Sequence, residues 1–377
     1  MPSRFPKILL LIFLVSIMAG ASAPAVDLET LIKGFQAIPA VTGNEEWLAA
    51  DIAAKLPGSY FKETDNLGGL YAWAGKQKPG GSLAVIAPLD DFGYVVSGFT
   101  ADGYLRLDRA SNPPSPVYDS FLIGHPVIIR IGWEPRCGIV AQPAMHVLTR
   151  ELRDQIAGSF SLDLVYVDVG ARTESEARDK GFSILDPVSL YPEYAALSGG
   201  KRAGPNLGRK AVAAASFAAA SSVSSSDKTD HVFVWAAQTR LTARGTRGSL
   251  GITRASNILK TSHSIVLDTV ADRADGKSPV LGKGPVLVLH KDILFPLRAA
   301  IEALAAKEKI PLQLAVGEMA PMLSPFNLDK GEAVGLALPV KFAGTPSEVV
   351  DLQDVQALSK IVSLLVASGP FVSGGVK

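Results

Sequence analysis

The chain has 377 residues, of which 47% are hydrophobic, so it can bury a large core and is long enough for two domains. Its 37 Lys and Arg residues almost balance its 36 Asp and Glu residues, which argues against nucleic acid as a partner. The single cysteine, Cys137, excludes an intramolecular disulfide.

Residues 1–25 have the pattern of a secretory signal peptide. Two basic residues precede an apolar run at 8–20, and small residues suited to cleavage follow it as far as Ala25. The alternative is an uncleaved membrane anchor, but the apolar run is shorter than the ~20 residues that a spanning helix needs. We therefore expect an exported protein, periplasmic or extracellular, with no membrane span after cleavage.

Helix and strand patterns alternate in the next part of the chain. Apolar residues at helical spacing predict helices at 28–38 and 45–56, and a strand follows at 66–75. The apolar segment 82–99 predicts two strands separated by a break at Pro88. This alternation indicates an α/β fold with a doubly wound, mostly parallel sheet.

The pattern changes between residues 99 and 203. Short strands with alternating polarity are separated there by proline and glycine turns, and little of the segment has helical spacing. We expect 99–203 to form a small β-rich domain inserted into the α/β domain. The α/β domain would then comprise 26–98 and 204–377.

After residue 204 the α/β alternation resumes. An alanine-rich helix at 210–221 is followed by a short, wholly apolar strand at 232–237. The remaining predicted elements are strands at 263–270, 284–290, 310–316 and 335–342 and helices at 297–308 and 350–368. Thr239 and Arg240 come just after strand 232–237, and open α/β sheets bind ligands at the carboxyl ends of their strands. We therefore expect a site at this position.

Several segments along the chain carry a family resemblance. They are, in order, AIPAVTGNEEWLAADIAAKL, DNLGGLYAWAGK, APLDDFGYVVSGFTADGYLRL and LPVKFAGTPSEVVDLQDVQAL. Together they resemble the glutamyl aminopeptidase family, dizinc enzymes that include tetrahedral, self-compartmentalising aminopeptidases. The resemblance implies a zinc-aminopeptidase-like α/β fold with an inserted PDZ-like or barrel-like domain. It also implies a homo-oligomer, since the family tends to form dimers and tetrahedral dodecamers.

The resemblance also assigns metal and catalytic positions. Family members hold two metal ions with two His, two Asp and one Glu, and a second Glu is the general base. The corresponding ligand positions in this chain are Pro88, Leu207, Arg240, Asp268 and Gly344, and the general-base position is Thr239. Only Asp268 keeps a ligand side chain. One carboxylate cannot hold a catalytic zinc, which generally uses three protein ligands, and a threonine hydroxyl is too weakly basic to replace the Glu.

We therefore expect no metal cofactor and no catalytic residue, and zinc or cobalt only if the ligands have been relocated. A remnant of the cleft should persist at Asp90, Arg209, Arg240, Asp268 and Glu348. Our hypothesis is that Arg240 bridges Asp90 and Asp268, because unpaired buried carboxylates are costly and arginine binds carboxylates with two hydrogen bonds. The alternative is a surface arginine on a loop.

Three functions agree with the sequence. The first is a catalytically inactive pseudo-peptidase with a binding or assembly role, binding peptides in the former cleft or on the β-rich domain. The second is an active hydrolase, either a metallo-aminopeptidase with relocated ligands or an enzyme with a different nucleophile. The third is a structural partner in a cell-envelope complex. Metal content would separate the first two, and co-purification with the envelope would favour the third.

Overall fold

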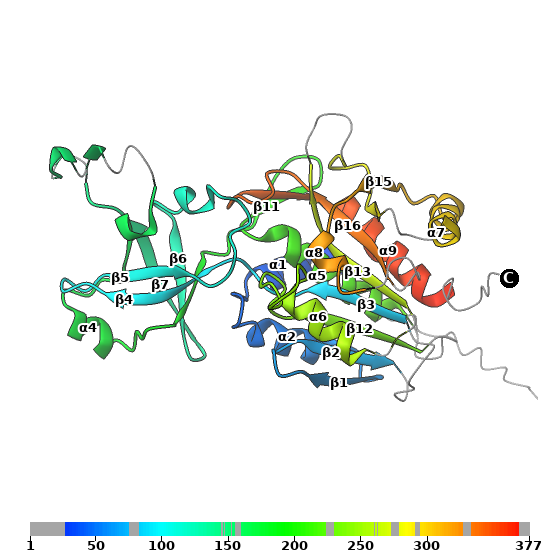
Figure 1. Cartoon of the computed structure of the whole chain (residues 1–377), viewed down its shortest axis with the longest axis horizontal. Coiled ribbons are helices and arrows are strands. Elements are labelled where there is room, and N and C mark those ends of the chain that lie inside the picture. The colour runs from blue at the N-terminus through cyan, green and yellow to red at the C-terminus, as the bar shows by residue number, and fades with distance from the viewer. Residues whose placement is uncertain are drawn as a thin grey trace, which may run out of the picture.

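An eight-stranded mixed sheet forms the centre of the larger domain in the computed structural model (Figure 1). In spatial order its strands are β1 (Tyr60–Thr64), β2 (Leu70–Ala74), β12 (His231–Ala236), β3 (Leu83–Pro88), β13 (His263–Ala271), β16 (Ala333–Val340), β14 (Val286–Leu289) and β15 (Gln313–Val316). The four central strands β12, β3, β13 and β16 are parallel to one another. The predicted α/β fold with a mostly parallel sheet is confirmed.

The structure describes residues 27–74, 83–144, 146, 148–151, 153–154, 160–223, 230–259, 261, 263–272, 279–290, 295–326 and 333–368. The predicted signal peptide lies outside these residues. Among the helices within them, none is long and apolar enough to cross a membrane.

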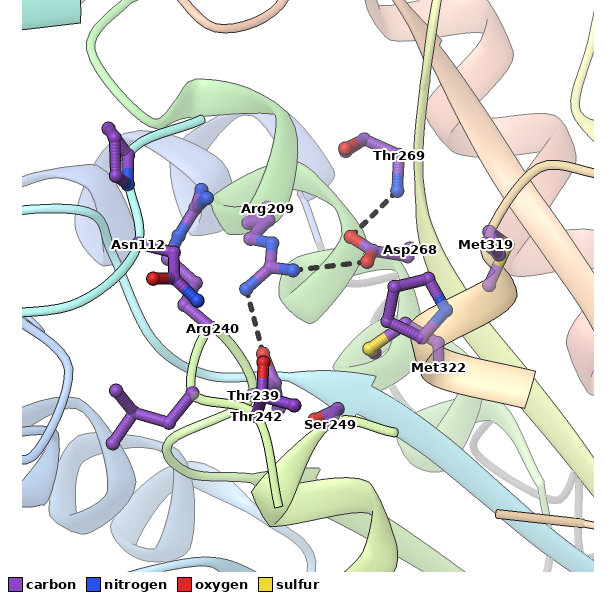
Figure 2. Close-up of a pocket in the computed structure, with 13 residues that line it drawn as sticks. Asn112, Arg209, Thr239, Arg240, Thr242, Ser249, Asp268, Thr269, Met319 and Met322 are labelled. Carbon is purple, nitrogen blue, oxygen red and sulfur yellow. Dashed lines mark hydrogen bonds and ion pairs between the residues drawn. The ribbon is translucent and has the colours of Figure 1, made fainter. Parts of the chain in front are cut away.

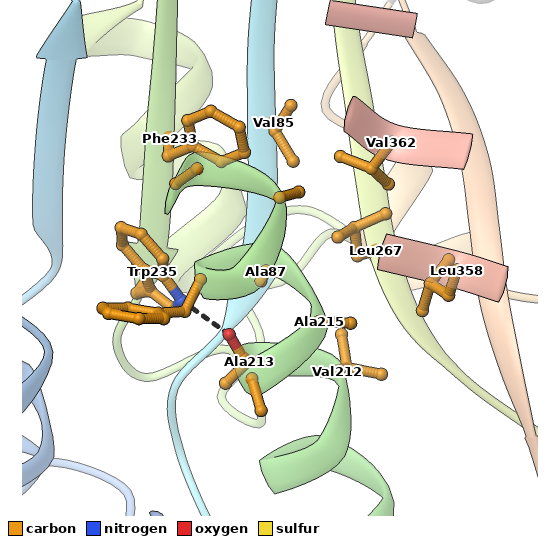
Figure 3. Packing of buried hydrophobic residues seen from close by; sticks show 14 of the residues in the cluster. Val85, Ala87, Val212, Ala213, Ala215, Phe233, Trp235, Leu267, Leu358 and Val362 are labelled. Atoms are coloured by element: carbon orange, nitrogen blue, oxygen red, sulfur yellow. Dashed lines mark hydrogen bonds between the residues drawn. The ribbon is translucent and has the colours of Figure 1, made fainter. Parts of the chain in front are cut away.

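Helices cover both faces of the sheet. One face carries α1 (Leu28–Gln36), α2 (Glu46–Lys55), α5 (Leu207–Ser222), α7 (Phe295–Lys307) and α9 (Leu352–Ser368). The other carries α6 (Leu250–Ile258) and α8 (Ala320–Leu323). Helix α5 packs against the sheet, and most of its alanines are buried in the shared core. Figure 3 shows Ala213 of α5 beside Trp235, whose Nε1 donates to the carbonyl oxygen of Ala213 at 3.2 Å.

The second domain is a closed antiparallel barrel (left in Figure 1). Its strands, in order around the barrel, are β4 (Tyr94–Phe99), β5 (Leu105–Arg109), β8 (Tyr166–Asp168), β7 (Glu134–Ala141), β6 (Pro126–Ile131) and β9 (Pro187–Leu190). Between the strands lie the short helices η1 (Tyr118–Phe121), η3 (Leu162–Leu164) and α4 (Glu174–Asp179). The predicted β-rich domain is therefore a barrel with its own apolar core.

The barrel strands begin at 94 and end at 190, whereas the predicted insertion spans 99–203. Strand β4 lies before the predicted boundary at residue 99, yet it belongs to the barrel because it pairs with β5 and β9. After the barrel, β10 (Ala195–Ala196) and β11 (Lys201–Gly204) form a small sheet with β17 (Glu348–Asp351), just before α9. The last residues of the predicted insertion thus pair with the α/β domain.

Arg130 of β6 joins the barrel to the α/β domain. Its guanidinium donates to the carbonyl oxygen of Asn44 at 3.1 Å, to Asn44 Oδ1 at 2.9 Å and to Glu46 Oε1 at 2.6 Å. It also lies 5.0 Å from the ring centre of Trp47, and Trp47 stacks on Trp133 of the β6–β7 turn. These contacts fix the barrel beside the amino-terminal end of α2.

Candidate functional site

Three parallel strands of the central sheet carry the candidate site at their carboxyl ends. Asp90 follows β3, Thr239 and Arg240 follow β12, and Asp268 lies within β13. Strand β3 pairs with β12 on one side and with β13 on the other, both in parallel. The strand ends therefore meet at one edge, where α/β sheets bind ligands. The structure thus brings these predicted site residues together.

Arg209, in the first turn of α5, lies across these strand ends. Its Nη1 donates to Asp90 Oδ1 at 3.0 Å and to Thr239 Oγ1 at 2.7 Å, and its Nη2 donates to Asp268 Oδ2 at 3.1 Å (Figure 2). Burial acts to lower the pKa of the guanidinium, but the carboxylates of Asp268 and Asp90 outweigh it and leave the pKa raised. Arg209 therefore stays charged, and its single positive charge is shared between the two carboxylates.

The predicted bridge between Asp90 and Asp268 thus exists, but the prediction that Arg240 makes it is wrong. Arg240 uses its backbone N–H, which donates to Asp90 Oδ2 at 2.9 Å. The chain turns sharply after β12, with Gln238 at a φ of +54°, and this turn points the Arg240 backbone at Asp90. Sequence pattern locates a strand end but does not give the direction of a side chain beyond such a turn.

The Asp90 carboxylate is completely buried and accepts hydrogen bonds from four groups. They are the Thr42 hydroxyl, Arg209 Nη1, the Thr239 hydroxyl and the Arg240 backbone N–H. A carboxylate offers about four lone-pair positions. Asp90 therefore has no position left for a metal ion.

Glu348 and Asp91 are the other carboxylates near the site. Glu348 Oε2 accepts the backbone N–H of Gly208 at 2.9 Å, and Asp91 Oδ2 pairs with Lys210 Nζ at 2.8 Å. Asp91 Oδ2 also accepts the backbone N–H of Ala40 at 3.1 Å. Burial raises the pKa of both carboxyl groups. Backbone or lysine donors therefore already engage both of these carboxylates.

The positions expected to hold metal in the family offer little to a cation. Pro88 ends β3, Leu207 begins α5 with its side chain fully buried in the apolar core, and Gly344 lies in a turn with a φ of +77°. None of these three side chains has a donor atom for a metal. Within the described residues, no group of three or more His, Cys, Asp or Glu side chains is placed to hold a metal ion. The residues present do not fit a dizinc centre.

Glu45 is a site residue that the sequence analysis missed. It is almost completely buried, and its Oε1 accepts the backbone N–H groups of Gly43 at 2.9 Å and Gln238 at 2.8 Å. Burial, reinforced by the negative charge of Asp90, raises its pKa to about 8. Glu45 therefore holds the turn after β12. Glu45 directly precedes α2, but its side chain makes no capping hydrogen bond to that helix, so no local sequence signal marked it.

A cavity of about 280 Å³ opens beside these groups. Arg209, Thr239, Arg240 and Asp268 lie on its polar side, and methionines and prolines supply apolar wall (Figure 2). The Nε of Arg240 is buried without a hydrogen-bond partner among the described residues. Burial, and then repulsion by Arg209, lower the pKa of Arg240 from its ordinary value. The arrangement can bind a small polar molecule. The carboxylate on its wall, Asp268, already accepts hydrogen bonds from Arg209 and from the backbone N–H of Thr269.

Comparison with known proteins agrees with this fold. A sequence model described as M42 glutamyl aminopeptidase matches residues 68–361. Lysyl aminopeptidase of Pyrococcus furiosus is 28% identical over 352 residues, which cover 90% of this chain and 97% of that protein. The putative aminopeptidase FrvX of Escherichia coli is 27% identical over 311 residues, covering 79% of this chain and 83% of that protein.

Two solved structures show the same fold. The TET1 peptidase of Pyrococcus horikoshii, which can assemble into a tetrahedron or a large octahedral shell, has a TM-score of 0.77 and 21% identity, covering 90% of this chain and 99% of that chain. An aminopeptidase of Desulfurococcus kamchatkensis has a TM-score of 0.78 and 18% identity, covering 93% of this chain and 98% of that chain.

Proposed function

Because this chain belongs to the M42 glutamyl aminopeptidase family, as its sequence resemblance implied, we propose that it keeps the family fold as a ligand-binding protein and does not hydrolyse peptides. The observation that carries the proposal is the double ion pair of Arg209 with Asp90 and Asp268. This guanidinium supplies positive charge beside Asp268, the one ligand position that kept its side chain. A dication there would be repelled by Arg209 and would have to displace its hydrogen bonds.

The chemistry of hydrolysis supports the same proposal. Metal-assisted hydrolysis needs a metal-bound water and a base to take its proton. The general-base position is Thr239, and its hydroxyl is already engaged with Asp90 and Arg209. Glu45 has a raised pKa, but it faces two backbone N–H groups and does not line the cavity. No residue of the site is therefore poised to activate water.

The ligand-binding role is proposed for the cavity beside Arg209. We also propose an exported protein, from the pattern at 1–25. A homo-oligomer is supported by the family, in which the TET1 peptidase assembles into closed shells. Size-exclusion chromatography with light scattering on the purified chain would give its oligomeric state directly.

Metal analysis and an activity assay on one sample test the proposal. The purified protein is loaded with zinc or with cobalt, dialysed, and measured for metal content and for cleavage of aminoacyl-anilides. The lysyl aminopeptidase of Pyrococcus furiosus serves as a positive control. We expect less than one metal ion per chain and hydrolysis at background. Two bound metal ions with turnover would overturn the proposal and favour an active metallo-aminopeptidase with relocated ligands.

A further inference from the structure

Arg240 differs from every other charged group of the site because its guanidinium has no ion-pair or hydrogen-bond partner within the described residues. Its backbone N–H binds Asp90, but its Nε is buried and unbonded. Arg209, on the neighbouring helix, donates three hydrogen bonds to protein groups. Arg240 is partly buried and lines the cavity, so a partner from solution can reach its guanidinium. A buried, unbonded Nε is unfavourable, so it invites a functional explanation.

The nearby carboxylates are already engaged elsewhere. Asp90 accepts four hydrogen bonds, one of which comes from the Arg240 backbone. Asp268 Oδ2 pairs with Arg209, and its Oδ1 accepts the backbone N–H of Thr269 at 2.8 Å. Glu348 accepts from backbone N–H groups. These carboxylates attract Arg240 through space but form no direct pair with it.

The cavity supplies the space for a missing partner. Its volume of about 280 Å³ suits a small organic molecule. The apolar wall includes Met319 and Met322, which lie just before and within α8. Asn112, between β5 and η1 of the barrel, also lines the cavity (Figure 2). Methionine side chains adapt to differently shaped apolar groups. The lining therefore matches a ligand with one anionic group and an apolar body.

We propose that this cavity binds a small organic carboxylate, with its carboxylate on the Arg240 guanidinium and its apolar body against Met319 and Met322. An N-acylated amino acid and the carboxyl end of a short peptide share this chemistry. A guanidinium can bind a carboxylate through two parallel hydrogen bonds. The attraction between the two charges is stronger where the surroundings exclude water. The inference rests on the proposed function in that the cleft binds a ligand and does not cleave it.

Binding of two matched probes tests the inference. N-acetyl-leucine and N-acetyl-leucinamide have the same body and differ only in the charge of the terminal group. Calorimetric titration of the purified full chain should give at least about tenfold tighter binding of the carboxylate. Equal affinity for the two probes would overturn the inference, as would failure of both to bind at millimolar concentration.

Two variants localise the charge. Arg240→Gln should lose the preference for the carboxylate, whereas Arg244→Gln, an exposed arginine in the same loop, should keep it. Arg240→Gln should also melt at about the same temperature as the parent chain, because within the described residues it removes no side-chain hydrogen bond or ion pair. A clearly lower melting temperature would mean that Arg240 is paired in the folded protein, and this would overturn the inference even without a ligand.

Two further measurements separate the possible outcomes. The first is the binding of inorganic phosphate. If phosphate binds more tightly than N-acetyl-leucine, and if Arg240→Gln abolishes that binding, the site favours a phosphate-bearing ligand and the assignment to a carboxylate is wrong. Metal content and anilide cleavage are measured on the same preparation. If the chain binds the carboxylate through Arg240 and also cleaves anilides with a bound metal, the carboxylate site is supported but the proposed function is wrong. If the chain binds no metal and shows no preference for the carboxylate probe, the carboxylate site is wrong and the proposed loss of hydrolysis still stands.

Discussion

The Nη2 atom of Arg209 lies 3.1 Å from Oδ2 of Asp268, while Nη1 of the same guanidinium lies 3.0 Å from Oδ1 of Asp90. One arginine from the first turn of a helix thus holds the ends of two strands, β3 and β13. The side chain of Arg209 is only 12% exposed and that of Asp90 is fully buried, so water screens this network little. This charged network is therefore largely buried, although Arg209 and Asp268 still line the cavity.

Replacing Arg209 by methionine should therefore destabilise the protein strongly. Arg209→Met leaves Asp90 and Asp268 as buried carboxylates without their hydrogen-bonded cation, and such losses cost about 3–5 kcal/mol. Urea unfolding followed by circular dichroism measures the change. Arg136→Met is the matched control, because its pair with Glu134 is exposed on both sides and should contribute at most about 1 kcal/mol. A loss of the same size in both variants would contradict a structural role for the Arg209 network.

The Thr239 hydroxyl should matter for stability and not for hydrolysis. Thr239→Val keeps the shape of the side chain but removes the hydrogen bonds to Asp90 and from Arg209, and should cost about 1–3 kcal/mol. Thr239→Ser, which keeps the hydroxyl, is the control and should lose less. Thermal unfolding of both variants gives the comparison. If valine is tolerated as well as serine, the hydroxyl does not hold the network.

Glutamate at the general-base position should not restore catalysis. In Thr239→Glu the new carboxylate would lie beside Asp90, and the ligand positions Pro88, Leu207 and Gly344 would still lack donor atoms. We expect anilide hydrolysis by this variant to stay at background after zinc or cobalt loading. Metal-dependent turnover above the parent chain would show that the remaining residues can hold a catalytic metal.

The raised pKa of Glu45 predicts a particular pH dependence of stability. In the unfolded chain a Glu titrates near its ordinary value of about 4.3, while in the folded protein Glu45 titrates at about 8. Between these values the folded state keeps a proton that the unfolded state has released. The free energy of unfolding contributed by Glu45 is therefore greatest below pH 4, and it falls as the pH rises towards 8.

Glu45→Gln should remove this contribution, because glutamine keeps an oxygen acceptor for Gly43 and Gln238 but does not ionise. Its stability relative to the parent chain should rise with pH from about 4.5 to 8, by an amount on the order of a few kcal/mol. Urea unfolding at several pH values measures the difference. The surface variant Glu134→Gln is the control. A difference between parent and Glu45→Gln that does not change with pH would contradict a raised pKa.

The sequence predicted the central sheet well because its strands are uninterrupted apolar runs. Strands β3 and β12 are buried along their whole length, and the strand pattern of β13 is almost as clear. Helix α6 was missed because threonine, arginine, serine and asparagine dilute its apolar spacing, although Ser249 caps it by accepting from the backbone of Ile252. The short strands β9 and β17 were missed because four residues carry little periodic signal.

The candidate site was predictable in its composition and not in its pairing. Asp90, Arg209, Thr239 and Asp268 were all expected in one cleft, and they do meet there. The prediction of Arg240 as the bridging arginine was wrong, because Arg209 can bridge the two carboxylates only when the first turn of α5 faces the strand ends. That orientation is fixed by tertiary packing of the alanine face of α5, which no local pattern of charges reports.

Arg130 offers a last test, of the contact between the two domains. Its planar guanidinium lies over Trp47 and donates to Asn44 and Glu46, and the residue is only 7% exposed. Arg130→Lys keeps the charge but loses the flat face and the forked donors, so it should cost about 1–3 kcal/mol. Glu46→Gln should cost less, because Glu46 is half-exposed and the amide oxygen of the new glutamine can still accept a hydrogen bond from Arg130. Thermal unfolding ranks the two variants, and limited proteolysis reports whether the barrel has loosened. If Arg130→Lys unfolds like the parent chain, stacking on Trp47 does not hold the domains together.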